Sequence, residues 1–498
     1  MRWLRILVVG ALAGTSALAA DWIRLRTANF DLYTTYLEND ARQTLEDFEQ
    51  TRDFFLRVNA FSITFHSPLR IVAFRHERDY RPYSRGPLIP AYFAADEDGD
   101  YIVMSDLEDQ RRRVAVHEYV HVLVRHSGLS IPLWLNEGLA EVYAGMETRD
   151  GKVLLGQIPR DRAYTLANSN WMRLTDLFRI GLDSSEYNEG DRQGVFYAQS
   201  CLLAHMLMLG DGWADKFSTF VEKVSASGDT AGALKETYGK SPGEIERAMN
   251  IYFRQPTVGG AAYRMTPRQV EIGPAQAVGE VEIGLVQAQI LAMLGRPAEG
   301  IAQLERLRAT HKESLEIEEA LARLEWRKGD RDASIGHFQA ILNRPGVDWK
   351  ACWDYARLLD ERGGDRGPEL AALRKTLELN PDWWPARFML GGRLFENNQP
   401  AEALDQFKQI RNPDPEHASS VYLAMALAAL AIHQPQEAKQ YAEQARKLAR
   451  KPEESSRADL LLRNIGQPPN SGTEMRPAFE SGDDPDRPVL RRRPKKPQ

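Results

Sequence analysis

Two consecutive apolar stretches in the first third of the chain each carry a few polar residues at helical spacing. The first, residues 113–124 (RVAVHEYVHVLV), is almost wholly apolar apart from two histidines and a glutamate. Gly128 and Pro132 interrupt the pattern, and LWLNEGLAEVYA (133–144) resumes it. The pattern predicts two helices joined by a short turn. Burying polar side chains without partners costs several kcal/mol, so the polar residues of these helices need partners.

The residues before these helices alternate between strand and helix patterns. Residues 22–35 (WIRLRTANFDLYTT) alternate as a strand does, with Ile23, Leu25, Phe30 and Leu32 as the candidate inward side chains. Residues 38–58 have helical periodicity, and three short apolar runs read as strands: 69–74, 91–95 and 101–105. Residues 21–104 therefore predict a small mixed sheet beside the first motif helix.

The rest of the chain is predicted to be helical. Residues 105–255 form a helical subdomain, which includes GVFYAQSCLLAHMLML from Gly194, and residues 256–280 read as a linker. Turn residues then recur at spacings of 34, 35, 34 and 35, at Gly295, Gly329, Gly364, Asn398 and His433. A helix–turn–helix period near 34 resembles tetratricopeptide (TPR) repeats. Residues 281–466 thus predict about five hairpins closed by a capping helix, and the Pro-rich residues 467–498 predict a disordered tail.

Composition narrows the classes of function. Residues 1–20 combine Arg2 and Arg5, a short apolar stretch and small residues, which predicts a signal peptide and export, most simply to a bacterial periplasm. That stretch is too short to span a bilayer well, and no other stretch approaches membrane length. Cys201 and Cys352 are expected to be buried apolar residues rather than a bridge. The formal net charge of −6 gives no electrostatic case for nucleic acid.

The first motif helix has the residue types of a metal site. His117 and His121 are four residues apart and project from one helix face. Two imidazoles placed in this way can supply two of the ligands of a zinc site. Glu118 lies off that face but can reach a metal-bound water, where a general base is needed. Glu137, on the second helix, is the natural third ligand. The alternative is an ordinary core helix whose histidines are satisfied by hydrogen bonds.

HEYVH followed by WLNEGLAE resembles the gluzincin metallopeptidases, in particular exported "peptidase MA-like" proteins in which helical repeats follow a gluzincin core. The resemblance implies one Zn²⁺ per chain held by His117, His121 and Glu137, with Glu118 as the base. It implies that Asn136 and Glu141 support the ligands, since a carboxylate beside a ligating histidine fixes its tautomer. The gap between His121 and Glu137 is shorter than in the aminopeptidase branch, so the connecting turn must differ.

The same resemblance extends to two further features. Tyr197 matches the aminopeptidase-branch tyrosine that stabilises the oxyanion, although it can also be a core residue, and His205 is the alternative donor or a core histidine. The strand around residues 91–95 would be the edge strand that pairs with extended peptide, or else a plain closing strand. The segment there is PAYFAA rather than the aminopeptidase GxMEN pattern, which leaves exo- or endopeptidase action and the substrate open.

We therefore expect an α+β gluzincin-like catalytic core, made of a small mixed sheet and a helical subdomain, followed by an all-α TPR solenoid. The expected function is that of an exported zinc metallopeptidase, with a peptide or protein substrate and a protein partner in the groove of the repeats. The alternative is an envelope scaffold with a vestigial peptidase site, whose repeats bind a partner. A purely structural zinc is the weakest reading, because structural sites are normally closed by four protein ligands.

Overall fold

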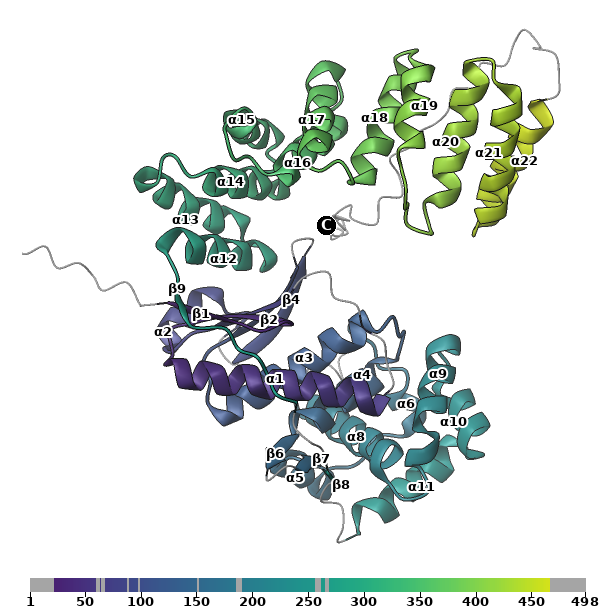
Figure 1. Ribbon diagram of the computed structural model, residues 1–498. Coiled ribbons are helices and arrows are strands. Elements are labelled where there is room, and N and C mark those ends of the chain that lie inside the picture. Colours follow the sequence, from purple (N-terminus) through teal and green to yellow (C-terminus); the bar gives the residue numbers. More distant parts are fainter. Residues whose placement is uncertain are drawn as a thin grey trace, which may run out of the picture. The chain divides into compact units, whose positions relative to one another are not determined.

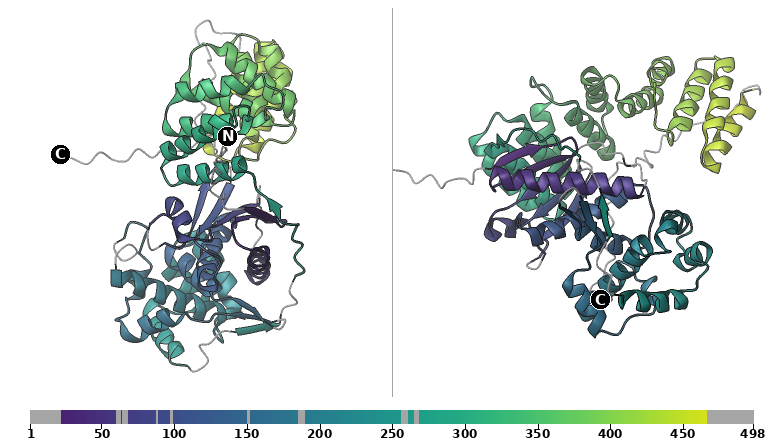
Figure 2. Two further views of the ribbon diagram at one scale, coloured as in Figure 1. Left: turned by 90° about the vertical axis from the view of Figure 1, so that its left-hand side faces the viewer. Right: turned by 60° about the horizontal axis from the view of Figure 1, so that its bottom comes forward.

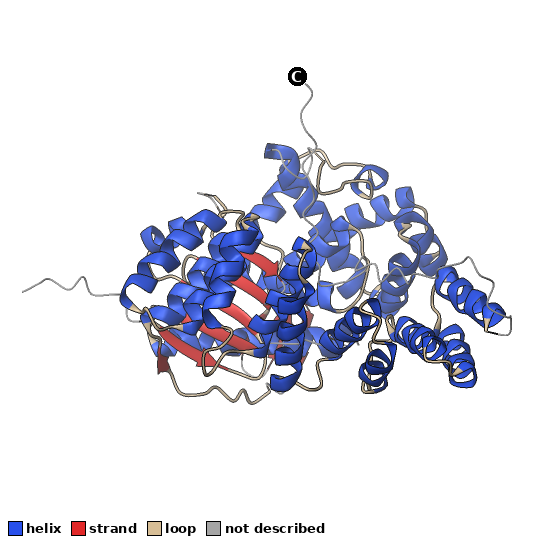
Figure 3. Ribbon diagram, turned by 90° about the horizontal axis from the view of Figure 1, so that it is seen from above, coloured by secondary structure: helices blue, strands red, loops and turns tan. Residues whose placement is uncertain are grey.

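The computed structural model describes residues 22–59, 63, 68–86, 89–96, 99–149, 152–184, 190–255, 261–264 and 268–465 (Figure 1). The chain forms two compact units, Met1–Leu294 and Gly295–Gln498. The expected signal peptide (residues 1–20) and tail (467–498) lie outside the described residues, as does part of the expected linker. The strands, red in Figure 3, all belong to the first unit within the part of the chain that is described.

A six-stranded mixed sheet organises the first unit, in the order β4-β5-β3-β2-β1-β9. Strand β2 pairs in parallel with β3 and β3 with β5, and the remaining pairs are antiparallel. Strand β4 is thus an edge strand, in the position expected for residues 91–95. The strands are β1 (Ile23–Arg26), β2 (Phe30–Thr34), β3 (Leu69–Ala73), β4 (Ala91–Asp96), β5 (Gly99–Met104) and β9 (Gln276–Ala277).

The alternating stretch 22–35 is two strands rather than one. Strands β1 and β2 form an antiparallel hairpin, with Leu25 opposite Leu32. The hydroxyl of Thr27 accepts hydrogen bonds from the backbone N–H groups of Asn29 and Phe30 and donates to Glu49. These bonds stabilise a turn that the alternation of side chains alone does not reveal, because alternation continues on both sides of it.

Both faces of the sheet are covered by helices. One face packs against α1 (Glu38–Asn59) and α3 (Asp109–His126), with Phe30, Phe48 and Tyr119 in mutual ring contact. The left view of Figure 2 shows α1 end-on beside this face. The other face packs against α12 (Glu280–Met293) through Ile283 and other apolar residues. The result is a core of three layers, in which α3 lies directly on the sheet.

The residues after α3 form a helical region with a small antiparallel sheet in the order β6-β7-β8. Helix α4 packs against α3 and α8, and α5 packs against α8. These elements are α4 (Leu133–Ala144), β6 (Glu147–Arg149), β7 (Lys152–Leu155), α5 (Arg160–Asn168), α6 (Leu174–Leu177), α8 (Gly190–Leu209), α9 (Phe217–Ser227), α10 (Thr230–Tyr238), α11 (Pro242–Phe253) and β8 (Ala261–Arg264). Short helices α2 (Glu77–Tyr80), η1 (Arg81–Tyr83) and η2 (Ala214–Lys216) complete this unit.

The boundary between the units differs from the expected one. The residues expected to be a linker supply strands β8 and β9, and α12, expected to begin the repeats, packs on the sheet. Glu282 of α12 accepts hydrogen bonds from Arg24 and from the hydroxyl of Tyr33. The helical pattern of α12 was predictable, but its packing partner is set by contacts more than 200 residues apart in sequence.

The second unit is an array of antiparallel helix pairs, which confirms the predicted helical repeats. Helices α14–α15, α16–α17, α18–α19 and α20–α21 pair as hairpins, between α13 and the closing helix α22. All five predicted turn residues have positive φ, including the non-glycine residues Asn398 (59°) and His433 (61°). The helices are α13 (Pro297–Thr310), α14 (Leu315–Lys328), α15 (Arg331–Ile341), α16 (Trp349–Arg362), α17 (Arg366–Leu379), α18 (Trp384–Glu396), α19 (Pro400–Lys408), α20 (Ala418–Ala431), α21 (Pro435–Leu448) and α22 (Pro452–Asn464).

Two further expectations concern single residues and membrane spans. Cys201 and Cys352 are buried free thiols, as expected, and each belongs to a different unit. Among the residues that the structure describes, none of the helices has both the length and the apolar composition that a membrane crossing requires.

Candidate metal centre

Helix α3 carries His117, Glu118 and His121 across the sheet and against α4. Its buried side chains, among them Ala115, Val120 and Leu123, pack into the core of the first unit. The two histidines project from the remaining face toward α4, and their side chains are 14% and 18% exposed. The helical spacing of the motif therefore places both imidazoles on the side where the second motif helix lies.

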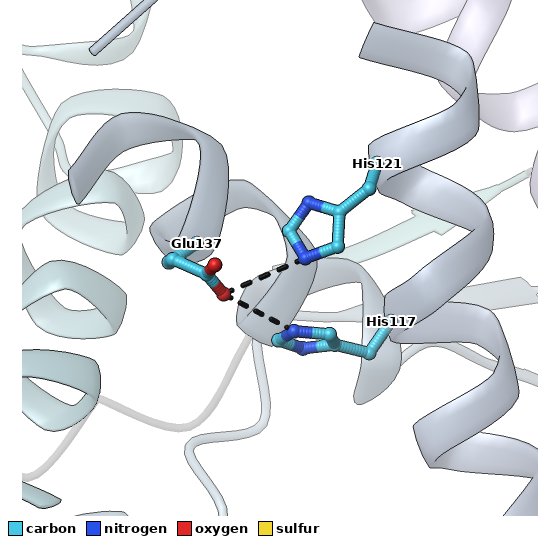
Figure 4. Close-up of side chains that lie close together, drawn as sticks. All are labelled: His117, His121 and Glu137. Atoms are coloured by element: carbon cyan, nitrogen blue, oxygen red, sulfur yellow. Dashed lines mark ion pairs between the residues drawn. The ribbon is translucent and has the colours of Figure 1, made fainter. Parts of the chain in front are cut away.

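Helix α4 brings Glu137 to the two histidines (Figure 4). Its Oε2 lies 3.2 Å from Nε2 of His117 and 3.5 Å from Nε2 of His121. The two imidazole rings are nearly perpendicular, with centroids 4.8 Å apart. One ligand atom from each residue lies within 4.8 Å of the other two. The structure thus brings the three expected ligands together from two helices.

The donor set and its spacing fit a zinc ion. Zinc prefers imidazole nitrogen and carboxylate oxygen at about 2.0–2.2 Å in tetrahedral geometry, so two of its ligand atoms lie about 3.3 Å apart. The separations of 3.2 Å and 3.5 Å around Glu137 are close to that value. Three protein ligands leave one tetrahedral position for water, as catalytic zinc sites do.

The outer nitrogen of each imidazole also faces a polar group on α4. Nδ1 of His121 lies 3.1 Å from Oδ1 of Asn136, and this contact places the proton on Nδ1 and leaves Nε2 for a metal. Nδ1 of His117 lies 3.7 Å from Oε1 of Glu141, within ion-pair distance but beyond a hydrogen bond. Asn136 and Glu141 therefore lie where the resemblance expects them, with the closer contact at His121.

The electrostatics of the cluster favour a cation. Burial lowers the pKa of His121, but the hydrogen bond and charge of Glu137 outweigh it and raise the pKa to about 9. Burial raises the pKa of Glu137, but its hydrogen bonds to both histidines outweigh it and lower the pKa to about 2. The negative charge of Glu137 that favours the protonated imidazole would also favour a metal cation, which displaces that proton when it binds.

Glu118 lies beside the cluster and faces the edge of the sheet. Its Oε2 accepts a hydrogen bond of 3.0 Å from the backbone N–H of Phe93 on strand β4. Among the residues that the structure describes, its second oxygen Oε1 has no hydrogen-bond donor. The contact with Phe93 was not predicted from the sequence, and it links the expected base directly to the expected edge strand.

Tyr197 lies next to the cluster, and His205 does not. The ring centroid of Tyr197, on α8, is 6.4 Å from that of His117, and the side chain is half-buried. His205, two turns further along α8, is buried in the core. Its Nδ1 accepts from the hydroxyl of Tyr252 at 2.8 Å, and its Nε2 donates to the carbonyl of Gly156 at 2.7 Å. His205 is therefore a core histidine with both nitrogens bonded.

Arg162 is a neighbour of the site that no sequence pattern singled out. It lies on α5 and forms a two-pronged ion pair with Glu141, with distances of 3.1 Å and 2.8 Å. An isolated arginine at a helix start carries no motif, and only the packing of α5 against α8 brings it here.

Gly138 allows α4 and α8 to approach closely at the site. A Cβ added to Gly138 would lie 2.4 Å from the carbonyl oxygen of Ser200 and 2.8 Å from Cβ of Ala204. We expect Gly138→Ala to lower the free energy of unfolding by about 1–3 kcal/mol, because two backbones must separate. Chemical denaturation measures this loss. Gly194→Ala on α8 is the control, since its Cβ meets nothing within 4 Å; equal stability of the two variants would contradict the close approach.

Comparison with known proteins gives similarity to helical-repeat proteins. No family model matches the chain, and no curated protein matches it. Three solved structures are YrrB, described as a TPR protein with an unusual peptide-binding site (16% identity, TM-score 0.32), MamA (14%, 0.29) and TTC0263, a thermophilic TPR protein of Thermus thermophilus (19%, 0.25). They cover 36%, 32% and 36% of this chain and 90%, 91% and 97% of their own lengths, respectively. The similarity supports the helical solenoid and gives no information on a peptidase core.

Proposed function

We propose that this chain is a zinc-dependent metallopeptidase whose site is built from α3 and α4 beside the sheet edge. The observation that carries the proposal is the convergence of His117, His121 and Glu137 within 4.8 Å, with Glu118 next to them. Together with the signal peptide expected at residues 1–20, this makes the proposed enzyme an exported one.

The chain's own residues divide the work of amide hydrolysis between them. A bound Zn²⁺ supplies a water of lowered pKa and a Lewis acid for the scissile carbonyl. Glu118 accepts the proton of the attacking water on its carboxylate and later delivers it to the leaving amine. The hydrogen bond from the Phe93 N–H holds Oε2 and leaves Oε1 for that proton. Tyr197 donates its phenolic hydrogen to the oxygen on which negative charge develops.

The edge strand β4 offers a docking line for an extended substrate. Successive residues of a strand direct their backbone groups to opposite sides, and Phe93 directs its N–H away from β5, toward Glu118. Ala91 and Ala95, two residues before and after, therefore direct theirs the same way. An extended peptide can pair with these groups and place one of its amides beside Glu118. A peptide in extended conformation is accordingly the proposed substrate class.

The proposal is tested by metal content and cleavage together. We expect the purified mature protein to bind one zinc per chain and to cut members of a diverse peptide library. Chelation is expected to abolish cleavage, and added zinc to restore it. The cut positions, read by mass spectrometry, separate exopeptidase from endopeptidase action. No zinc at the cluster would overturn the proposal, and zinc binding without cleavage would favour the second candidate.

The second candidate is a binding scaffold in which the helical array does the work. Arrays of stacked hairpins present extended surfaces that bind peptides or proteins. Partly exposed aromatic residues follow the array, with Trp349 and Trp353 both within ring contact of Trp383, and Trp384 beside His417. Under this candidate a partner is retained by the protein regardless of zinc, and substitution of Glu118 changes nothing that can be measured.

A further inference from the structure

Arg162 connects two parts of the proposed site that lie on different helices. Its Nη2 donates to Oε1 of Glu141 at 2.8 Å and its Nε to Oε2 at 3.1 Å. A guanidinium that binds both oxygens of a carboxylate fixes its rotation as well as its position. The side chains are 24% and 8% exposed, so this pair is shielded from solvent far more than a surface ion pair.

The same guanidinium also lies over the ring of Tyr197. Its Cζ is 5.2 Å from the ring centroid, within the range of a cation–π contact. Tyr197 in turn lies beside His117, and Glu141 faces Nδ1 of His117 at 3.7 Å. His117 on α3, Glu141 on α4, Arg162 on α5 and Tyr197 on α8 thus form a ring of four side chains, in which each contacts the next.

We infer that Arg162 is a positioning residue that fixes Glu141 and Tyr197 against His117, an inference that rests on the proposed function. Arg162 holds the Glu141 carboxylate 3.7 Å from Nδ1 of His117, where its negative charge favours the tautomer that carries the proton on Nδ1 and leaves Nε2 for zinc. It also holds the ring of Tyr197 in place, and a cation on the ring face makes the hydroxyl a stronger hydrogen-bond donor.

Loss of Arg162 has a definite physical consequence. Glu141 would remain a buried carboxylate without its cation, so it would rotate toward solvent or toward another donor. His117 would then lose the carboxylate that faces its Nδ1. The ring of Tyr197 would lose its contact with the guanidinium of Arg162. Substitutions of groups that orient metal ligands typically weaken metal binding about 10- to 100-fold.

The test uses three single variants of Arg162 and Arg160 in the full-length mature protein, together with Tyr197→Phe alone and combined with Arg162→Gln. Arg162→Gln removes both the positive charge and the paired hydrogen bonds to Glu141. Arg162→Lys keeps the positive charge but cannot form the paired hydrogen bonds. Arg160→Gln is the control, because Arg160 lies on the same helix and is exposed. The readouts are zinc affinity by chelator competition, the visible spectrum of the Co²⁺-substituted protein, and kcat and KM for a peptide cut by the wild type. The melting temperature of the metal-free proteins verifies folding.

We expect Arg162→Gln to bind zinc at least about tenfold more weakly and to shift the Co²⁺ spectrum. At saturating zinc its kcat is expected to fall about tenfold with KM within twofold, and Arg162→Lys is expected to recover part of both losses. On a Tyr197→Phe background the Gln substitution should lower kcat by a smaller factor, because the two residues act together. Arg160→Gln should match the wild type.

Three results would overturn the inference. If Arg162→Gln and the wild type share zinc affinity and Co²⁺ spectrum, Arg162 positions nothing, although a wild type that still cleaves peptide keeps the proposed function. If KM rises while zinc affinity is unchanged, Arg162 contacts substrate instead. If the wild type itself binds no zinc at the cluster, the proposed function fails and the inference fails with it. Should Arg162→Gln not fold, Arg162→Lys decides by the same readouts.

Discussion

Glu118→Gln is expected to lower kcat for peptide hydrolysis by about a hundredfold to ten-thousandfold, the range that a positioned general base contributes. The glutamine has the shape of the glutamate, and its carbonyl oxygen can still accept the hydrogen bond from the Phe93 N–H. It cannot accept a proton from water, however. The change therefore removes the proton acceptor while the geometry at the sheet edge is kept.

Two measurements show whether this loss is chemical. Zinc content should remain at one per chain, because His117, His121 and Glu137 are unchanged, and the melting temperature should match that of the wild type. Glu108→Gln is the matched control, since Glu108 is exposed and directly precedes α3. Turnover of Glu118→Gln near the wild-type value would contradict the role of Glu118 as base.

The cluster could be predicted from the sequence because helical geometry fixes most of it. Four-residue spacing puts His117 and His121 on one face, and the apolar residues around them require that helix to be buried. A short interruption at Gly128, which has φ of 71°, then returns the chain so that α4 packs against α3. Glu137 follows from that return, because it is the fifth residue of the second helix, close to the point where that helix begins.

The contacts that could not be predicted join elements that are distant in sequence. Arg162 reaches Glu141 only because α5 packs against α8, and Phe93 reaches Glu118 only because β4 is the sheet edge next to α3. Likewise, α12 has the same helical pattern as the repeats, but its apolar residues pack against the sheet. Periodicity identifies a helix and its apolar face, whereas the partner of that face depends on the whole topology.

In the helical array the largest expected effect comes from Arg393→Met, which should lower local stability by about 3 kcal/mol. Arg393 is 8% exposed and its Nε donates to Oε1 of Glu369 at 2.6 Å, while Glu369 is 1% exposed. It also bonds Asp360 and Glu396, so that one guanidinium joins α16, α17 and α18. Methionine fills similar space but leaves the three carboxylates to share Arg366 alone, and breaking a buried ion pair typically costs about 3–5 kcal/mol. Arg366, which donates to Oε2 of Glu369 at 2.7 Å, keeps the loss near the lower end.

Hydrogen exchange of peptides from α16 to α18 measures this loss as a lower free energy of local opening. Arg374→Met on α17 is the control, because Arg374 is exposed and its loss should change stability by less than about 0.5 kcal/mol. Adding Glu369→Met to Arg393→Met should recover part of the stability, since the uncompensated charge is then gone.

Zinc affinity should be unchanged in all three variants, because these residues belong to the second unit. If Arg393→Met opened no faster than Arg374→Met, the ion cluster would not hold the hairpins together, and apolar packing between the helices alone would account for the stability of the array.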